Sequence, residues 1–179
     1  MILFQEDLLS IRTLTESDAS LLVKWLSDPQ VLEYYEGRDR SHDLALVMEH
    51  FYKQEQSTTR CIIQYNGEEI GYLQFYIIDD EEKEEYGYTG FQGNVYGMDQ
   101  FIGEVSYWNK GIGTLLIINV VKYLFQKGAN KIVMDPQAWN HRALRVYEKC
   151  GFTKKKLLPE HEWHEGAFRD CWLIEYTEL

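Results

Sequence analysis

A strongly apolar segment that follows a short glycine-bearing loop is the feature that most constrains the fold of this chain. Residues 111–127 (GIGTLLIINVVKYLFQK) are predicted to form a helix, and Gly128 is placed to act as its C-cap. The flanking stretches, 95–102 (VYGMDQFI) and 131–135 (KIVMD), have the character of strands. A strand, a helix and another strand in succession predict a mixed α/β chain, with a central sheet and helices on its faces.

The remaining segments agree with this fold class. Thr15 and Asp18 resemble a capping box that opens a helix, and a second helix is expected to start at Ser41. The NGEE tetrad at 66–69 is a strong hairpin signal, and residues 79–94 are expected to form an acidic, glycine-punctuated loop. Further strands are predicted at 8–14, 58–65, 70–78, 152–158 and 168–176, and a further helix at 140–150.

Composition limits both the class of protein and the class of partner. With 179 residues, 45% of them hydrophobic, the chain is predicted to form a single domain, 1–179, around one core. It carries 29 acidic against 18 basic residues, so general binding to nucleic acid or to an anionic membrane is not expected. The same balance favours a cationic partner, although acidity that serves solubility alone would look the same.

The cysteine and histidine residues indicate neither a disulfide framework nor a metal site. Cys61, Cys150 and Cys171 are odd in number, widely spaced and set among apolar residues, as is typical of reduced cysteines in a cytoplasmic protein. The HEWHE run at 161–165 has two histidines three residues apart, but it lacks the H-E-x-x-H pattern and a third ligand. We therefore expect a cytoplasmic protein without a bound metal and without a membrane span.

The loop ahead of the apolar helix has the properties of an anion-binding site. A helix N-terminus leaves backbone N–H groups unpaired and carries about half a positive charge. Gly111 and Gly113 would let a phosphate approach that backbone closely, and Lys110 adds a formal charge. The loop has neither the Walker spacing nor the G-x-G-x-x-G fingerprint, so a tight turn with close packing remains the alternative.

A second motif lies downstream, after the strand that ends in VMD. Asn140, Ala143, Tyr147 and the pair Gly151–Phe152 occur at helical spacing. Together with GIGT they resemble the acyl-CoA-binding core of the GNAT acetyltransferase superfamily, which pairs a Q/R-x-x-G-x-G/A loop with an N-x-x-A-x-x-x-Y-x-x-x-G-F helix. Trp108 stands where the superfamily usually has Gln or Arg. The resemblance implies the GNAT fold, a mostly antiparallel sheet whose splayed parallel strand pair holds acetyl-CoA.

Flanking segments extend the resemblance to the aminoglycoside 6′-N-acetyltransferases. The matching stretches include VLEYYEGRD, IGYLQFY, MDPQAWNHRALRVYEKCGF and LPEHEWHEG. The resemblance implies acetyl-CoA as co-substrate, an aminoglycoside antibiotic as acceptor and resistance as the outcome. It also implies that the cofactor contacts are Phe101, Ile102, Lys110, Gly111, Ile112, Gly113, Thr114, Asn140, Ala143 and Tyr147.

Acetyl transfer to an amine requires a base for the amine and a proton for the departing thiolate. An alkyl amine has a pKa of about 10, so it arrives mostly protonated. Asp99 lies in the middle of a predicted strand, where a carboxylate without a role would be costly, and it is the candidate base. By the resemblance, Tyr147 would protonate the thiolate. The alternatives are a structural hydrogen-bond acceptor for Asp99 and a core aromatic for Tyr147.

The acceptor site is predicted less sharply. Asp135 ends a strand directly before Pro136, and the resemblance implies that it binds amino groups of the substrate; capping the following loop is its alternative role. By the same resemblance, weaker candidates for this pocket, each with packing or surface exposure as its alternative role, are Trp25, Glu33, Tyr35, Gln74, Tyr76, Tyr96 and Glu165. Within the superfamily a polyamine or a protein N-terminus is the alternative acceptor, and an inactive acyl-CoA-binding module is the alternative from another class.

Overall fold

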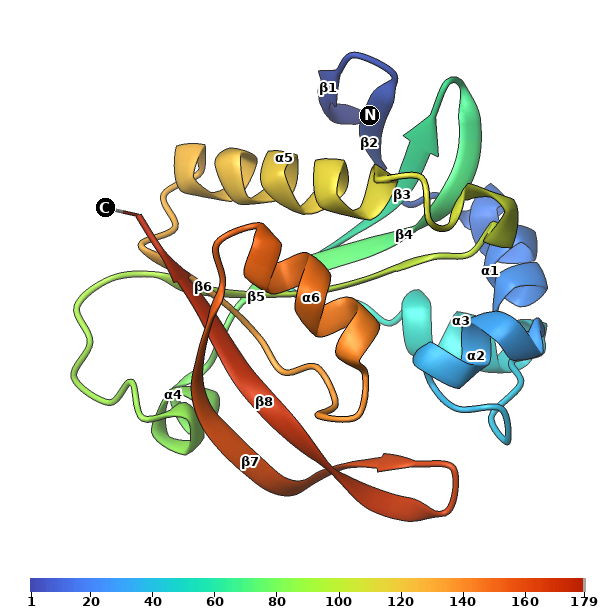
Figure 1. Cartoon of the computed structure of the whole chain (residues 1–179). Coiled ribbons are helices and arrows are strands. Elements are labelled where there is room, and N and C mark those ends of the chain that lie inside the picture. The colour runs from blue at the N-terminus through green and yellow to red at the C-terminus, as the bar shows by residue number, and fades with distance from the viewer. Residues whose placement is uncertain (179) are drawn as a thin grey trace. The chain divides into compact units, whose positions relative to one another are not determined.

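The computed structural model describes residues 1–178 (Figure 1). The strands are β1 (Ile2–Glu6), β2 (Leu9–Thr13), β3 (Thr58–Tyr65), β4 (Glu68–Ile77), β5 (Val95–Ile102), β6 (Lys131–Met134), β7 (Thr153–His164) and β8 (Ala167–Thr177). The α-helices are α1 (Ala19–Trp25), α2 (Pro29–Tyr34), α3 (Leu44–Phe51), α4 (Asp80–Tyr86), α5 (Ile112–Gln126) and α6 (His141–Lys149). Two 3-10 turns, η1 (Glu16–Asp18) and η2 (Val105–Tyr107), precede α1 and α5.

The strands form one mixed sheet in the order β1-β2-β3-β4-β5-β6-β8-β7. The pairs β1–β2, β2–β3, β6–β8 and β7–β8 are antiparallel, and β5 and β6 are parallel. The parallel register runs from Val95↔Lys131 to Gly97↔Val133, and β5 then continues as far as Ile102. The predicted mixed α/β sheet with one parallel pair is therefore confirmed.

Backbone contacts divide the chain into two compact units. The first contains Met1–Gln74 and Gln100–Gly113, and the second contains Phe75–Asp99 and the chain from Thr114 onward. Strands β4 and β5 each begin in one unit and end in the other. The single domain expected from the sequence stays a prediction.

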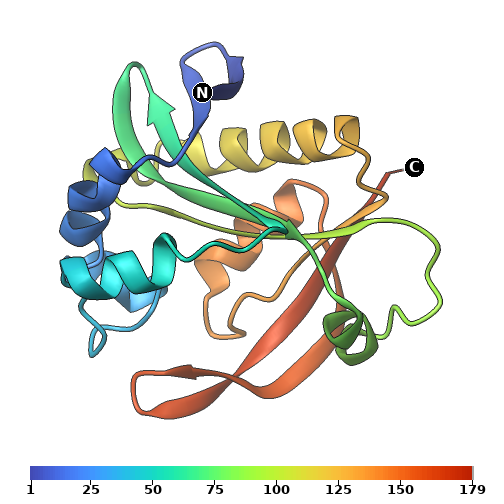
Figure 2. The same cartoon turned by 180° about the vertical axis from the view of Figure 1, so that it is seen from behind.

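The first unit has a core built on its short helices, which lie together in Figure 2. Helix α1 and its C-cap residue bury an apolar face, because Leu22, Trp25 and Leu26 are at most 1% exposed. The second unit has its own core, in which Val95 and Leu173 are completely buried. Its longest hairpin, β7–β8, turns at Glu165 and Gly166, both of which have positive φ.

Local signals explain several element boundaries. The hairpin between β3 and β4 turns at Asn66 (φ 51°) and Gly67 (φ 81°), as the NG dipeptide predicts. Helix α3 does not start at Ser41 as expected: it starts at Leu44, because the Asp43 side chain accepts a hydrogen bond from the Leu46 N–H. Strand β1 and helix α2 were not predicted.

The expectation of a loop over the acidic segment 79–94 was wrong for residues 80–86, which are helical, whereas residues 88–94 contain no helix or strand. The segment contains α4, capped at its start by the Asp79 side chain, which accepts a hydrogen bond from the Glu82 N–H at 2.8 Å. Acidic residues fill the first turn, where the helix dipole favours negative charge. Gly87 ends the helix in the left-handed conformation (φ 80°).

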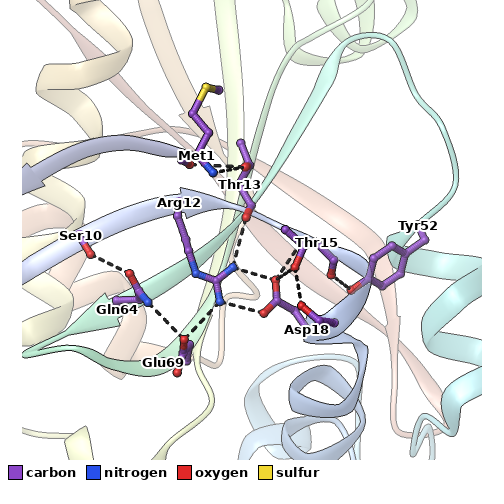
Figure 3. A network of polar contacts seen from close by, with 10 residues as sticks. Met1, Ser10, Arg12, Thr13, Thr15, Asp18, Tyr52, Gln64 and Glu69 are labelled. Atoms are coloured by element: carbon purple, nitrogen blue, oxygen red, sulfur yellow. Dashed lines mark hydrogen bonds and ion pairs between the residues drawn. The ribbon is translucent and has the colours of Figure 1, made fainter.

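A polar network stabilises the start of α1 in the first unit (Figure 3). The Arg12 guanidinium donates two hydrogen bonds of 2.8 Å to Asp18, and a third of 3.3 Å to Glu69. The predicted capping box is present, because the Thr15 N–H donates to Asp18 Oδ2 at 2.8 Å. Burial by itself would raise the pKa of Asp18, but the hydrogen bonds from Arg12 and Thr15 outweigh it and lower this pKa.

Asp18→Asn is expected to lower the free energy of unfolding by about 3 kcal/mol, because it leaves Arg12 without its bidentate partner. A depressed carboxyl pKa stabilises the fold above the unfolded pKa, and this contribution is lost as pH falls through the folded pKa. Urea unfolding at pH 7 and at lower pH measures both effects, with the exposed neighbour variant Glu16→Gln as the control. Equal stability of Asp18→Asn and wild type at pH 7 would contradict the assignment.

Candidate functional site

The glycine loop of the first unit leaves space beside its backbone. Gly111 adopts φ +77° and Asn109 φ 58°, so the chain turns sharply before α5 starts at Ile112. A Cβ atom built on Gly111 or on Gly113 would have no heavy atom within 4 Å. Lys110 is exposed next to them. The first turn of α5 therefore presents its N-terminal backbone to open space, as an anion cradle requires.

Trp108 stabilises this loop by a contact that the sequence did not reveal. Its indole N–H donates to the carbonyl oxygen of Ile102, at the end of β5, at 2.8 Å. Its ring also packs edge-on against Tyr34, with 5.9 Å between ring centroids. Trp108 is thus a positioning residue that fixes the loop relative to the end of β5.

The second motif lies on α6 in the second unit. Asn140 caps this helix, because its side-chain oxygen accepts a hydrogen bond from the Ala143 N–H at 3.2 Å. Tyr147 is half-buried and packs edge-on against Phe152. One turn further on, the Cys150 thiol lies 3.7 Å from the carbonyl oxygen of Thr114, so the end of α6 contacts the start of α5.

The two predicted acids of the second unit both act electrostatically on Tyr76. A Cβ atom on Gly97 would lie 2.6 Å from the Tyr76 ring, so this glycine leaves the room that the ring occupies. Burial, and then the charges of Asp99 and Asp135, raise the pKa of Tyr76, which keeps its hydroxyl protonated. Asp99, Asp135 and Tyr76 therefore form one acidic group, which we call the acid cluster.

Asp135 has two further partners that sequence reasoning missed. Its Oδ2 atom accepts hydrogen bonds from Tyr86 Oη at 3.3 Å and from His161 Nε2 at 2.9 Å. Tyr86 comes from α4, in the segment expected to be a loop, and His161 was considered only as a metal ligand. Burial, and then the charge of Asp135, raise the pKa of Tyr86, so it too is a neutral donor. The Asp135 side chain is 31% exposed and can still be reached from solvent.

The weaker candidates fall into separate environments. Trp25 is 1% exposed and donates to Glu104 Oε1 at 2.9 Å, so it packs in the first unit's core. The Tyr35 ring packs at a tilt of 46° against Phe101, with 4.6 Å between the ring centroids. Gln74 accepts a hydrogen bond from the Tyr72 hydroxyl.

The other candidates from that group also differ in surroundings. Tyr96 is three residues from Asp99 on β5, and the alternation of side chains along a strand places it on the opposite face. Glu33 is half-buried on α2, and Glu165 lies at the β7–β8 turn.

Comparison with known proteins identifies the family. A family model described as "Acetyltransferase (GNAT) domain" matches residues 15–159. The chain belongs to the GNAT acetyltransferase family. Its GNAT fold, predicted from the two motifs, is thereby confirmed. Within residues 1–178 of this GNAT chain, no helix is long and apolar enough to cross a membrane.

Relatives of this GNAT chain include named enzymes. It is 35% identical over 156 residues to the aminoglycoside N(6′)-acetyltransferase type 1 of Klebsiella pneumoniae, covering 83% of this chain and 76% of the relative. The aminoglycoside acetyltransferase AAC(6′)-Ib in complex with coenzyme A and kanamycin is 30% identical with a TM-score of 0.74, covering 94% of each chain. A spermidine N-acetyltransferase from Vibrio cholerae (18% identity, TM-score 0.77, 96% of each chain) shares the fold alone.

Proposed function

We propose that this protein transfers an acetyl group from acetyl-CoA to the 6′-amine of aminoglycoside antibiotics and so confers resistance. The observation that carries the proposal is the acid cluster of the second unit, in a chain 35% identical to an aminoglycoside N(6′)-acetyltransferase. An aminoglycoside carries several ammonium groups, and carboxylates beside neutral tyrosine hydroxyls are suited to bind them.

Acetyl-CoA supplies the acetyl thioester, and the residues beside it bind it and move protons. In this proposal the first turn of α5 and the residues Lys110–Gly113 hold the pyrophosphate, because the space beside Gly111 and Gly113 is open. Phe101 and Ile102 provide backbone contacts near the acetyl group. Thr114, Asn140 and Ala143 complete the cofactor contacts; the Asn140 side chain also caps α6.

Asp99 and Tyr147 carry the proton transfers. Asp99 anchors the 6′-ammonium and accepts one of its protons, which leaves a neutral amine to attack the acetyl carbonyl. The new C–N bond forms as the C–S bond breaks, and the Tyr147 hydroxyl donates a proton to the departing sulfur. Asp135 binds another ammonium group of the antibiotic.

The structure supports the remaining candidate residues of the antibiotic pocket to different degrees. Tyr76 is supported by the charges of both Asp99 and Asp135, which act on its pKa in the same direction. Trp25 is better explained as a core residue, since it is 1% exposed. Glu33, Tyr35, Gln74, Tyr96 and Glu165 stay predictions. A cytoplasmic location is also proposed, because acetyl-CoA is an intracellular metabolite and the three cysteines are free.

The proposal is tested by measuring thiol release from acetyl-CoA with a matched pair of antibiotics. Neomycin carries an amine at the 6′ position and paromomycin carries a hydroxyl there, while the rest of the two molecules is the same. We expect rapid release with neomycin and much slower release with paromomycin and spermidine, because a hydroxyl is a poorer nucleophile and spermidine lacks the sugar rings. Equal rates with both antibiotics, or release with spermidine alone, would contradict the proposal.

A further inference from the structure

His161 lies between two carboxylates at the edge of the acid cluster. Its Nε2 atom is 2.9 Å from Asp135 Oδ2, and its Nδ1 atom is 3.1 Å from Glu85 Oε1 on α4. Its side chain is 17% exposed, against 31% for Asp135 and 49% for Glu85. Both carboxylates can therefore be reached from solvent, while the imidazole between them is more deeply set.

An irregularity in β7 accompanies this placement. The register between β7 and β8 shifts between Leu158 and Glu162, and Glu160 adopts φ +48° within that stretch. Bulges of this kind redirect a side chain and occur often next to active sites. The position of His161 beside Asp135 is thus coupled to an irregular, locally costly backbone conformation.

The geometry favours a positive charge on the imidazole. The Nε2 atom forms a hydrogen bond with Asp135, and the Nδ1 atom lies at ion-pair distance from Glu85. A cation at this position is attracted by both carboxylates, whereas a neutral ring keeps only the hydrogen bond to Asp135. The hydrogen bond to Asp135 is the main reason that the pKa of His161 is raised, and the charges of Asp135, Glu85 and Glu162 act in the same direction.

The surrounding elements are mostly acidic. The charged groups that act on the pKa of His161 are Asp135 after β6, Glu85 from α4 and Glu162 from β7, and the Tyr86 ring of α4 lies 6.3 Å from the imidazole. Lys156 from β7 donates a hydrogen bond to the backbone carbonyl of Glu85. These surroundings favour a cation at the His161 position, whether imidazolium or a ligand ammonium.

We propose that the His161 imidazolium is an internal substitute for a substrate ammonium group at Asp135, so that an aminoglycoside competes with it for that carboxylate. This inference rests on the proposed function, because it takes Asp135 as a substrate-binding residue. It makes His161 a specificity-determining residue that sets the pH range in which the antibiotic binds.

The direction of the pH effect follows from the two charge states. Below the folded-state pKa of His161 the cation is present, and the antibiotic must displace it. Above that pKa the ring is neutral and holds Asp135 only by an uncharged hydrogen bond, so the antibiotic ammonium displaces it more easily. The contribution of His161 to stability is complete below the unfolded pKa and is lost as pH rises through the folded pKa.

The test compares His161→Gln with wild type across pH 6 to 8.5, using calorimetric binding of neomycin. At pH 6 we expect the variant to bind neomycin more tightly than wild type, and the two Kd values to converge at the alkaline end. The ratio of the wild-type Kd to the variant Kd should grow by up to about tenfold for each pH unit below the pKa of His161. The reason is that the fraction of wild-type protein with a neutral His161, which binds neomycin without displacing a cation, falls at that rate. Neomycin itself loses protons as pH rises, but this changes its Kd for the variant and for wild type by the same factor and cancels in the ratio. The control is His50→Gln on α3 of the first unit, which should show no such pH-dependent gap.

Weaker neomycin binding by His161→Gln at every pH, or a ratio that does not change with pH, would overturn the inference. A second measurement uses the wild-type protein, so it does not depend on the variant folding. NMR titration of the His161 ring should show its pKa falling when neomycin saturates the protein, and an unchanged or raised pKa would overturn the inference. A protein that acetylates neomycin but fails these tests keeps its proposed function, whereas one that neither binds nor acetylates neomycin loses both.

Discussion

Asp99→Asn is expected to lower kcat for neomycin acetylation by roughly two to four orders of magnitude, the range typical of losing a general base. Asparagine has nearly the same shape but cannot accept the proton of the 6′-ammonium. Affinity for CoA should stay the same, because the proposed cofactor contacts on β5, the glycine loop and α6 do not include the Asp99 side chain. Steady-state kinetics at pH 7 and CoA binding by calorimetry measure the two effects.

The pH profile separates a base from a structural acceptor. Without a base the variant depends on amine that is already neutral in solution, so its rate should rise steeply with pH, more so than in wild type. The exposed loop residue Asp39, replaced by asparagine, is the matched control and should leave kcat unchanged. A near-wild-type kcat for Asp99→Asn at pH 7 would remove Asp99 from the chemistry.

Gly113→Val is expected to weaken CoA binding by roughly 10- to 100-fold, which corresponds to about 1.4–2.8 kcal/mol. The side chain would project into the open space beside the first turn of α5, where the pyrophosphate is proposed to bind. The free energy of unfolding should change by less than about 1 kcal/mol, because glycine is itself a poor helix former and a Cβ atom at this position meets no protein neighbour within 4 Å.

Side chains of increasing size at position 113 test whether the loss of CoA binding comes from filling the space beside α5. Gly113→Ala should have a smaller effect on CoA binding than Gly113→Val, since it fills less of the space. Lys122→Val, at an exposed position of the same helix, controls for placing a β-branched residue in α5 and should bind CoA normally. A folded Gly113→Val protein with unchanged CoA affinity would contradict the location of the phosphate cradle.

The sequence predicted best those features that depend on local chemistry. The NG turn between β3 and β4 and the capping box of Thr15 and Asp18 each involve residues within a few positions of one another. Strand β5 was also predicted with its observed bounds, because its apolar run is sharply delimited. The glycine loop before α5 and the Asn140 helix were identified by their motifs for the same reason.

The sequence failed where a role depends on distant contacts or on irregular backbone. Tyr86 and His161 are 49 and 26 residues away from Asp135, and no local pattern pairs them. The placement of His161 also depends on the register shift in β7, which an alternating pattern of side chains does not encode. Trp25 illustrates a related ambiguity: an aromatic residue on an amphipathic helix can face the core or a ligand, and its side chain is 1% exposed in the structure.

The contact between Gly97 and Tyr76 restricts how this enzyme can evolve. Any side chain at position 97 would overlap the Tyr76 ring at 2.6 Å, so residue 97 cannot change while the tyrosine stays in place. A smaller residue at position 76 would free the space but would also remove a hydroxyl that lies near both acids. A change of antibiotic range at these two positions therefore requires substitutions at both. A population that acquires one mutation at a time reaches such a pair slowly.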